Sequence, residues 1–268
     1  MKINTVAFAG FVRSFGLIRT LNFVRFLVEK VSNRTANKAF KKHYPNIPLP
    51  PDYLMFESFG LDYSRYYLNG RETFKWIVDE AQHFIKLENT NFLDWACGPG
   101  RVVRHMPDFV PKSVALFGTD YNLKSILWCK ENINGVTFNH NSDQATLPYD
   151  DDFFSLIYGI SIITHLSVEK HNEWIQEMYR LLKPGGILML TSHGDNFKSK
   201  LNREELLIYN SGHLVIRGNT KLGHRTFAAY HPTKAMQQLF TKFEILKHEQ
   251  FDQAGLSYIP QDLWILRK

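Results

Sequence analysis

The segment FLDWACGPGR, residues 92–101, organises the rest of the chain around it. Phe92, Leu93 and Trp95 are apolar and favour a buried strand. Gly98 and Gly100 follow, and glycine permits both positive φ angles and the close approach of a ligand to the backbone. A helix expected to begin near Gly100 would point its unpaired N–H groups at such a ligand. The pattern is typical of a ligand-binding turn between a strand and a helix, although a plain structural turn fits it as well.

Two acidic residues are expected at strand ends beside this turn. Asp94 lies near the end of the first predicted strand, residues 91–95. Asp120 comes directly after the second predicted strand, residues 114–119. Asp120 comes twenty residues after Gly100, a spacing at which the carboxylate of a neighbouring strand can accept hydrogen bonds from both hydroxyls of a ribose. Asp120 also fits an N-cap for a helix over residues 122–133, and the two roles are compatible.

Strands and helices alternate through the rest of the chain. Further strands are predicted at residues 136–139, 153–158 and 187–191, and helices at residues 71–86 and after Ser167. Residues 243–248 and 257–267 are predicted to form a final hairpin, which makes the last strand antiparallel. Alternation of this kind predicts an α/β fold with a doubly wound parallel sheet. Tyr258, Gln261 and Asp262 should then lie at the same sheet edge as His165 and His193, where ligands bind in open α/β sheets.

Composition and charge limit the possible classes. The chain has 268 residues, enough for one α/β domain and an appendage. Residues 1–42 carry nine Lys or Arg against one Glu, a charge of +8, so the remainder of the +6 chain carries 6 − 8 = −2. Two cysteines provide neither a disulfide framework nor zinc spacing, which favours the reducing cytoplasm. No apolar run is long enough for a membrane span, and Arg13 interrupts any signal peptide.

The basic N-terminal segment is expected to be helical. Its apolar residues Phe8, Phe11, Phe15, Ile18 and Phe26 share one helical face. Three interpretations remain open: a helical cap on the main domain, a peripheral contact of residues 1–42 with the inner membrane surface or a protein partner, and nucleic-acid binding. Nucleic acid is not expected as a partner, because no recognition motif accompanies the charge. A proline-rich linker divides residues 1–56 from the predicted catalytic domain, residues 57–268.

Four motifs in succession resemble those of class I S-adenosylmethionine-dependent methyltransferases. They are FLDWACGPGR, FGTDYN, NSDQATLPYDDDFFSLIYGISIITHL and YRLLKPGGILMLTSHG, and together they cover roughly residues 70–195. The resemblance implies a Rossmann-like sheet of seven strands whose last strand is antiparallel, and S-adenosylmethionine as cofactor. The chain departs from the family pattern at Ala96, where glycine is common. Alanine is the mildest replacement, so we expect cofactor binding to survive.

The resemblance also implies roles for individual residues. Asp94, Ala96, Cys97, Gly98 and Gly100 would hold the methionine part of the cofactor, and Asp120 would hold the ribose. The adenine would be framed by Tyr121 and by residues 141–144, which include Asn141, Ser142 and Asp143. Ile160 would contact the methionine end together with Ser161.

Three histidines are candidates for a general base. A hydroxyl acceptor needs a base with a pKa near neutrality, and histidine is suited to that task. His193 follows a strand end and ranks first, His165 second and His231 third. No metal is expected, because the contiguous aspartates 150–152 are typical of a solvated turn. The long segment 193–230 is expected to cover the site of an unidentified acceptor.

Two other functions remain open from the residues alone. A nicotinamide-dependent oxidoreductase would use a similar turn, but the third glycine of the dinucleotide fingerprint is absent after Gly100. A non-catalytic cofactor-binding scaffold would retain the cofactor residues and lose only the acceptor site.

Overall fold

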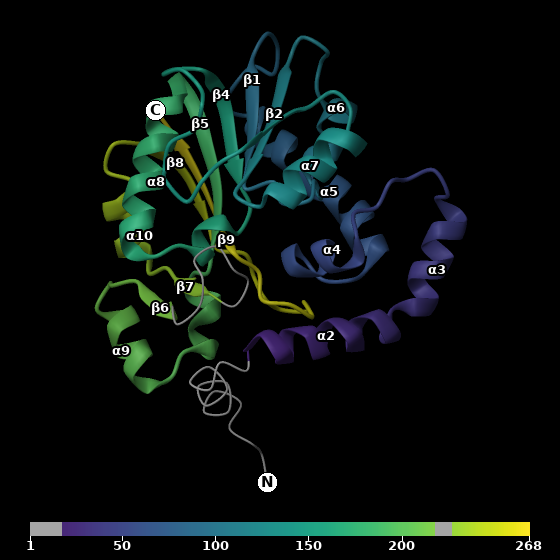
Figure 1. Ribbon diagram of the computed structural model, residues 1–268. Coiled ribbons are helices and arrows are strands. Elements are labelled where there is room, and N and C mark those ends of the chain that lie inside the picture. The colour runs from purple at the N-terminus through teal and green to yellow at the C-terminus, as the bar shows by residue number, and fades with distance from the viewer. Residues whose placement is uncertain (1–17, 218–226) are drawn as a thin grey trace. The chain divides into compact units, whose positions relative to one another are not determined.

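The computed structural model describes residues 18–217 and 227–268 (Figure 1). Within these ranges a seven-stranded sheet has the order β3-β2-β1-β4-β5-β9-β8. Its strands are β1 (Asn91–Trp95), β2 (Ala115–Asp120), β3 (Thr137–His140), β4 (Phe154–Gly159), β5 (Leu182–Ser192), β8 (Glu244–Glu249) and β9 (Asp262–Arg267). Strands β1 to β5 are mutually parallel, and β9 pairs antiparallel with both β5 and β8. The predicted doubly wound sheet with a reversed last strand is therefore confirmed.

Helices cover both faces of this sheet. One face is covered by α5 (Tyr63–Ala81), the short α6 (Met106–Phe109) and α7 (Leu123–Asn132), and the other by α8 (Val168–Leu181) and α10 (Thr233–Leu239), as Figure 1 shows. Single 3-10 turns lie at η1 (Val103–His105), η2 (Ile162–His165) and η3 (Asp195–Lys200). Between η3 and α10 come α9 (Arg203–Asn210) and a small antiparallel pair, β6 (Val215–Arg217) and β7 (Ala228–Tyr230).

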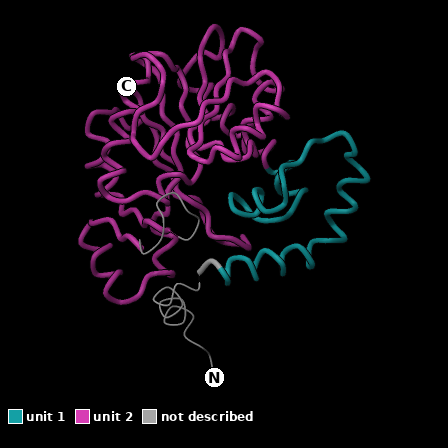
Figure 2. Tube along the Cα trace, in the orientation of Figure 1, with its two compact units in different colours: residues 1–69 teal, residues 70–268 magenta. Residues whose placement is uncertain are grey.

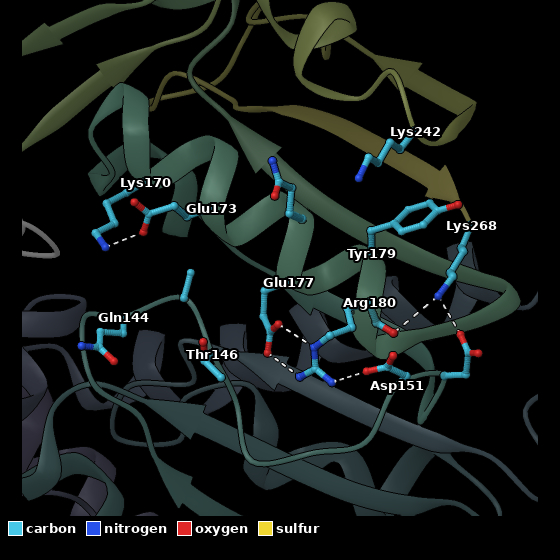
Figure 3. Close-up of a pocket in the computed structure, with 13 residues that line it drawn as sticks. Gln144, Thr146, Asp151, Lys170, Glu173, Glu177, Tyr179, Arg180, Lys242 and Lys268 are labelled. Atoms are coloured by element: carbon cyan, nitrogen blue, oxygen red, sulfur yellow. Dashed lines mark hydrogen bonds and ion pairs between the residues drawn. The ribbon is translucent and has the colours of Figure 1, made fainter.

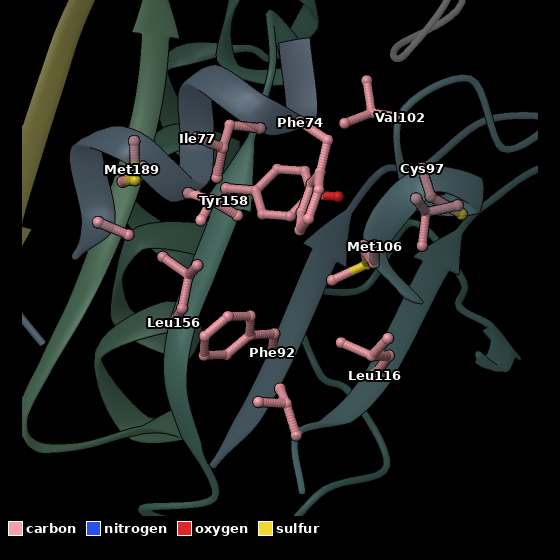
Figure 4. Packing of buried hydrophobic residues seen from close by; sticks show 14 of the residues in the cluster. Phe74, Ile77, Phe92, Cys97, Val102, Met106, Leu116, Leu156, Tyr158 and Met189 are labelled. Atoms are coloured by element: carbon pink, nitrogen blue, oxygen red, sulfur yellow. The ribbon is translucent and has the colours of Figure 1, made fainter. Parts of the chain in front are cut away.

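The core forms because side chains along the central strands alternate between the two faces. In β1, Phe92 packs against the α5 and α7 side, where it joins Phe74, Ile77 and Leu116 (Figure 4). The next residue, Leu93, packs against the α8 and α10 side with a separate set of buried residues. Since both faces are buried, the middle of each central strand is largely apolar, as expected for a parallel sheet covered by helices, and the acids Asp94 and Asp120 lie near the carboxyl ends of β1 and β2.

Several predicted boundaries were wrong. Helix α5 spans residues 63–81 and not 71–86, although Phe74, Ile77, Val78 and Ala81 are buried as expected. Strand β9 begins at Asp262, five residues after the predicted start, and the segment before it is a loop in which Tyr258 is exposed. Strand β5 begins at Leu182, directly after α8 and five residues before the predicted start at residue 187.

The chain divides into two compact units, residues 1–69 and 70–268 (Figure 2). The division falls within α5, thirteen residues beyond the predicted boundary at residue 56. The first unit contains α2 (Ile18–Ser32), α3 (Arg34–His43), α4 (Asp52–Ser58) and the start of α5. Its core is aromatic and is formed by Phe26, Phe40, Met55, Phe56, Leu61, Tyr63 and Tyr66. Phe8, Phe11 and Phe15, which were assigned to an apolar helical face, lie outside the described residues.

Candidate functional site

The turn after β1 has the backbone that its glycines predict. Ala96, Gly98 and Gly100 all have positive φ angles, 63°, 54° and 81°. A Cβ atom on Gly100 would come within 2.3 Å of the Ile133 side chain, so only glycine fits there. The helix expected to begin near Gly100 is replaced by the 3-10 turn η1, which begins at Val103, and by the four-residue α6. A helix this short gives the turn little of the dipole that the sequence predicted.

Asp120 connects the tip of β2 to this turn. Its Oδ2 accepts a hydrogen bond from Gly98 N at 2.9 Å, and its Oδ1 accepts one from Asn122 N at 2.7 Å. Burial raises the pKa of Asp120 to about 6, while the two N–H donors oppose that shift. The N-cap of α7 is Asn122, whose side chain accepts from Lys124 N. Asp120 therefore braces the turn and does not cap the helix.

Asp94 is buried beneath the same turn. The Tyr158 hydroxyl donates a hydrogen bond to Asp94 Oδ2 at 2.8 Å. Burial raises the pKa of Asp94 to about 8, and the hydrogen bond from Tyr158 and the charge of Arg101 only partly offset this effect. At neutral pH the Asp94 carboxyl therefore holds a proton, and a cation placed beside it would displace that proton.

A pocket of about 430 Å³ opens at the carboxyl edge of β1, β2 and β3. Five of the predicted cofactor residues line it: Ala96, Tyr121, Asn141, Ser142 and Asp143. The rest of its wall comes from Trp95, His140, Ile162, Leu166, Lys170 and Trp174. The sequence reasoning missed this second group, and only the helical spacing of Trp174 could have indicated its inward direction.

The other predicted cofactor residues lie around this pocket but do not line it. The Cys97 side chain is buried in the core beside Cys129, and the thiols of both residues lie 3.6 Å from Gly98 O. Ile160 packs on the same core. Ser161 has a φ of 65° and is held by Thr191, whose Oγ1 accepts from Ser161 N, and by Gln261, whose Nε2 donates to Ser161 Oγ. This bracing across β5 and the loop before β9 places Gln261 at the sheet edge, as expected.

The three candidate histidines are brought together around β7. His165 Nδ1 lies 2.9 Å from Phe227 O, and His193 Nδ1 lies 3.0 Å from Ala229 O. His231 N donates to His193 O at 2.8 Å. Because a carbonyl oxygen can only accept, Nδ1 carries the proton in neutral His165 and His193, and each Nε2 then carries a lone pair.

His193 and His231 differ in their surroundings. The His193 ring stacks on Phe197 with centroids 4.1 Å apart, and burial lowers the pKa of His193 to about 4. His231 is 1% exposed, and its Nε2 lies 3.0 Å from His171 Nε2. Since His171 Nδ1 donates to Ser167 O, its Nε2 accepts the proton of His231 Nε2. His231 is thus committed to a buried partner, whereas His193 is only half-buried.

The sheet edge also contains the buried carboxylate of Asp262, which the sequence predicted to lie at this edge without giving it a role. Asp262 Oδ2 accepts from His248 Nε2 at 2.9 Å, and the His248 ring stacks on Trp264. A Cβ atom on Gly194 would collide with the Asp262 carboxylate, so the chain after β5 passes directly over this acid. Asp262 therefore fixes the path of the segment that carries His193.

A larger pocket, of about 730 Å³, lies along α8 and away from the glycine turn (Figure 3). Its charged side chains already pair with one another: Arg180 with Glu177 and Asp151, Lys268 with Asp152, and Lys170 with Glu173. Because these ion pairs already engage most of its charged groups, and because the pocket lies away from the glycine turn, we place the functional site at the smaller pocket. Within residues 18–217 and 227–268, no group of three or more His, Cys, Asp or Glu side chains could hold a metal ion.

Comparison with known proteins agrees with this geometry. A family model described as "Methyltransferase domain" matches residues 92–186, which run from β1 through the glycine turn into β5. This match and the fold together support a class I S-adenosylmethionine-dependent methyltransferase. A methyltransferase structure from Methanosarcina mazei is 20% identical, covers 70% of this chain and 96% of its own, and has a TM-score of 0.54. At that identity it supports the fold alone.

Two curated relatives resemble the methyltransferase domain over shorter lengths. A tRNA (carboxymethyluridine(34)-5-O)-methyltransferase from Arabidopsis thaliana is 30% identical over 37% of this chain. A phosphoethanolamine N-methyltransferase from Plasmodium falciparum is 29% identical over 40% of it. The matched segments span only 23% and 40% of those relatives' own lengths.

The pocket of the methyltransferase domain fits S-adenosylmethionine, the cofactor that the family and the fold imply. Its volume lies within the range of about 300–1,000 Å³ that is typical of small-ligand sites. Tyr121 offers an aromatic ring, Ser142 and Asp143 offer polar groups for a base, and Asp120 holds a carboxylate beside the turn. These are the groups that recognise a nucleoside.

Proposed function

We propose that the protein transfers a methyl group from S-adenosylmethionine to a hydroxyl of a small-molecule, saccharide or lipid-linked acceptor. The observation that carries this proposal is the orientation of His193. Its Nδ1 is held by Ala229 O, which leaves Nε2 as an acceptor. His193 follows the carboxyl end of β5, on the same edge of the sheet as the cofactor pocket, but it is not among the residues that line that pocket. A hydroxyl that attacks carbon must lose its proton, and a neutral imidazole nitrogen can accept it.

The cofactor supplies an electrophilic methyl group when bound. Asp120 would hold its ribose, the glycine turn would hold its methionine part, and Asp94 would face its ammonium group. Burial lowers the pKa of His193 to about 4, so the imidazole is neutral at physiological pH and its Nε2 can accept a proton, although as a weaker base than the near-neutral one that the sequence predicted. A proton accepted there is released readily, since the same burial disfavours the imidazolium.

His165 and His231 would support this step. His165 lies in η2 between Ile162 and Leu166, which line the cofactor pocket, so it is the second candidate to contact the acceptor. His231 is buried, and its backbone N–H holds His193 O, which makes it a positioning residue. Segment 193–230 would cover the acceptor, although its residues 218–226 lie outside the described part of the chain.

The two relatives act on different atoms, an oxygen in one name and a nitrogen in the other. An amine acceptor is nucleophilic once neutral and needs a base less than an alcohol does. The arrangement of two histidines with acceptor nitrogens therefore favours a hydroxyl.

Titration calorimetry on the full chain tests the cofactor part of the proposal. S-adenosylmethionine and S-adenosylhomocysteine should both bind, and NAD should not; binding of NAD alone would favour the oxidoreductase alternative. A panel of hydroxyl and amine acceptors, screened by release of S-adenosylhomocysteine, tests the transfer. Turnover only with amines would refute the hydroxyl assignment, and cofactor binding without any turnover would favour a non-catalytic scaffold.

Residues 1–42 would serve a different purpose, a peripheral contact with a membrane surface or a protein partner in the cytoplasm. Among the described helices none is long and apolar enough to cross a membrane.

A further inference from the structure

Helix α2 presents an apolar face to solvent. Six side chains on this helix are between 43% and 75% exposed: Leu21, Phe23, Val24, Leu27, Val28 and Val31. On a helix with 3.6 residues per turn these six positions form one continuous arc. A contiguous exposed apolar patch of this kind marks an interaction surface, unlike apolar residues scattered singly.

The opposite face of α2 is fixed within its own unit. Phe26 packs on Tyr53 and Phe56 with ring centroids 5.2 and 5.4 Å apart. Glu29 Oε2 accepts from Leu61 N at 2.9 Å, and Asn33 Nδ2 donates to Leu61 O at 2.9 Å. These contacts fix the rotation of the helix about its axis. The apolar arc therefore cannot turn inward without losing both hydrogen bonds and the aromatic packing.

Basic side chains border the apolar arc. Arg25 and Lys30 flank it on its two sides, and α3 adds Arg34, Lys38, Lys41 and Lys42. Residues 20–43 hold six Lys or Arg and one Glu, a charge of 6 − 1 = +5. A second copy of the chain would bring an equal positive charge against this face. An anionic lipid surface complements both the apolar arc and its charge.

We propose that α2 lies in the plane of an anionic bilayer surface, with its six exposed apolar side chains in the acyl boundary. Arg25 and Lys30 lie on the helix flanks, where Arg25 pairs with Glu29 at 3.1 Å and Lys30 with Asp52 at 2.9 Å, and at the bilayer surface the lipid phosphates would compete for both side chains. The lysines of α3 add electrostatic attraction. This inference does not depend on methyl transfer, because no residue of the cofactor pocket takes part in it.

Vesicle flotation of the full chain tests the proposal. Wild-type protein should float with vesicles of phosphatidylcholine and phosphatidylglycerol and bind pure phosphatidylcholine more weakly. The double variant Val24→Asp/Val28→Asp should lose at least about tenfold in partitioning, since both side chains leave the acyl boundary. Its matched control is Leu123→Asp/Leu127→Asp on α7, where two leucines, each 50% exposed, have the same spacing. The control should float like the wild type.

Charge is tested separately on α3. Lys38→Glu/Lys42→Glu should weaken binding to the anionic vesicles by at least about fivefold for each lysine removed, and added salt should weaken wild-type binding similarly. Binding to pure phosphatidylcholine should not change. Circular dichroism of each variant should match the wild type, because the substituted side chains are exposed.

Three results would overturn the proposal. The first is a failure of flotation to depend on the apolar arc: either the wild-type protein remains in the bottom fraction with anionic vesicles, or the Val24/Val28 variant floats as well as the wild type. The second is a dimer in sedimentation that this variant abolishes, which would assign the face to a second copy. The third is strong hydrogen-exchange protection of residues 21–31 without vesicles, beyond that of α7, which would show that another part of this chain covers the face.

Discussion

Replacement of Asp120 by asparagine separates the cofactor role of this residue from its structural role. The side chain keeps its shape, but one of its two acceptor oxygens becomes an NH₂ group. That group must then face an N–H donor, either that of Gly98 or that of Asn122, which now lie 2.9 and 2.7 Å from the carboxylate. One buried hydrogen bond is lost at the point where the turn meets β2.

The expected loss of stability is small because two effects oppose each other. A hydrogen bond to a charged group contributes about 1.5–3 kcal/mol. Burial, however, raises the pKa of Asp120 to about 6, some two units above the usual aspartate value, which corresponds to about 3 kcal/mol of disfavour for the charged form. Loss of the charge relieves that cost, so Asp120→Asn should change the free energy of unfolding by no more than about 2 kcal/mol.

Cofactor affinity should fall much more clearly. A ribose diol would lose one acceptor, and the turn would lose its brace, for a cost of about 1.5–3 kcal/mol, or about 10- to 150-fold in affinity. Calorimetry with S-adenosylhomocysteine measures this loss, and urea denaturation measures stability. The matched control is Asn122→Ala, which removes the N-cap bond to Lys124 N and should cost about 1 kcal/mol of stability without loss of affinity. Normal affinity in Asp120→Asn with reduced affinity in Asn122→Ala would refute the ribose assignment.

Three further predictions concern the same edge of the sheet. Ala96→Gly should stabilise the protein by about 0.5–1 kcal/mol in urea denaturation. An alanine in the left-handed region costs about 1–2 kcal/mol, and the greater conformational entropy that glycine loses on folding offsets only part of the gain from removing this strain. Lower stability of the variant would contradict the strain argument. Below about pH 8, the affinity for S-adenosylhomocysteine should increase with increasing pH by up to tenfold per unit, because its ammonium group would displace the Asp94 proton. Calorimetry in buffers of different ionisation enthalpy should detect the released proton, and Asp94→Asn should abolish that release. His193→Ala should lower turnover by about 10²–10⁴-fold with unchanged cofactor affinity, whereas His213→Ala, an exposed control in the same segment, should not.

The sheet was predictable from the sequence because its strands are buried on both faces. In continuous apolar runs such as Ile187 to Leu190, successive side chains are buried against opposite helix layers, and few other structures accommodate such runs. The glycine turn was predictable for a similar reason, since Gly100 has no room for a Cβ atom. The helix expected to begin near Gly100 is displaced to Val103 and is short, because Val110 precedes Pro111, adopts an extended backbone and ends α6 after four residues.

The surface of α2 shows why the rest was harder to predict. The sequence assigned Phe26 to an apolar face shared with residues before position 18, but the structure buries Phe26 and exposes Leu21, Val24, Val28 and Val31. Helical periodicity gives two apolar directions here, and only the long-range bonds of Glu29 and Asn33 to Leu61 select the one that faces inward. Contacts between residues about thirty positions apart leave no local signal in a sequence.

The sequence identified the three histidines one at a time, but it did not show that all three make hydrogen bonds at the short strand β7 or directly beside it. Its carbonyl at Ala229, and the one at Phe227 just before it, hold His193 and His165 through Nδ1, and the residue just after it, His231, holds His193 O. The strand thus selects the tautomer in which both Nε2 atoms are acceptors. Since β7 belongs to the segment proposed to cover the acceptor, any movement of that cover would also move the hydrogen bonds that orient both candidate bases. Acceptor binding and the proton-accepting geometry of the site would then be formed together.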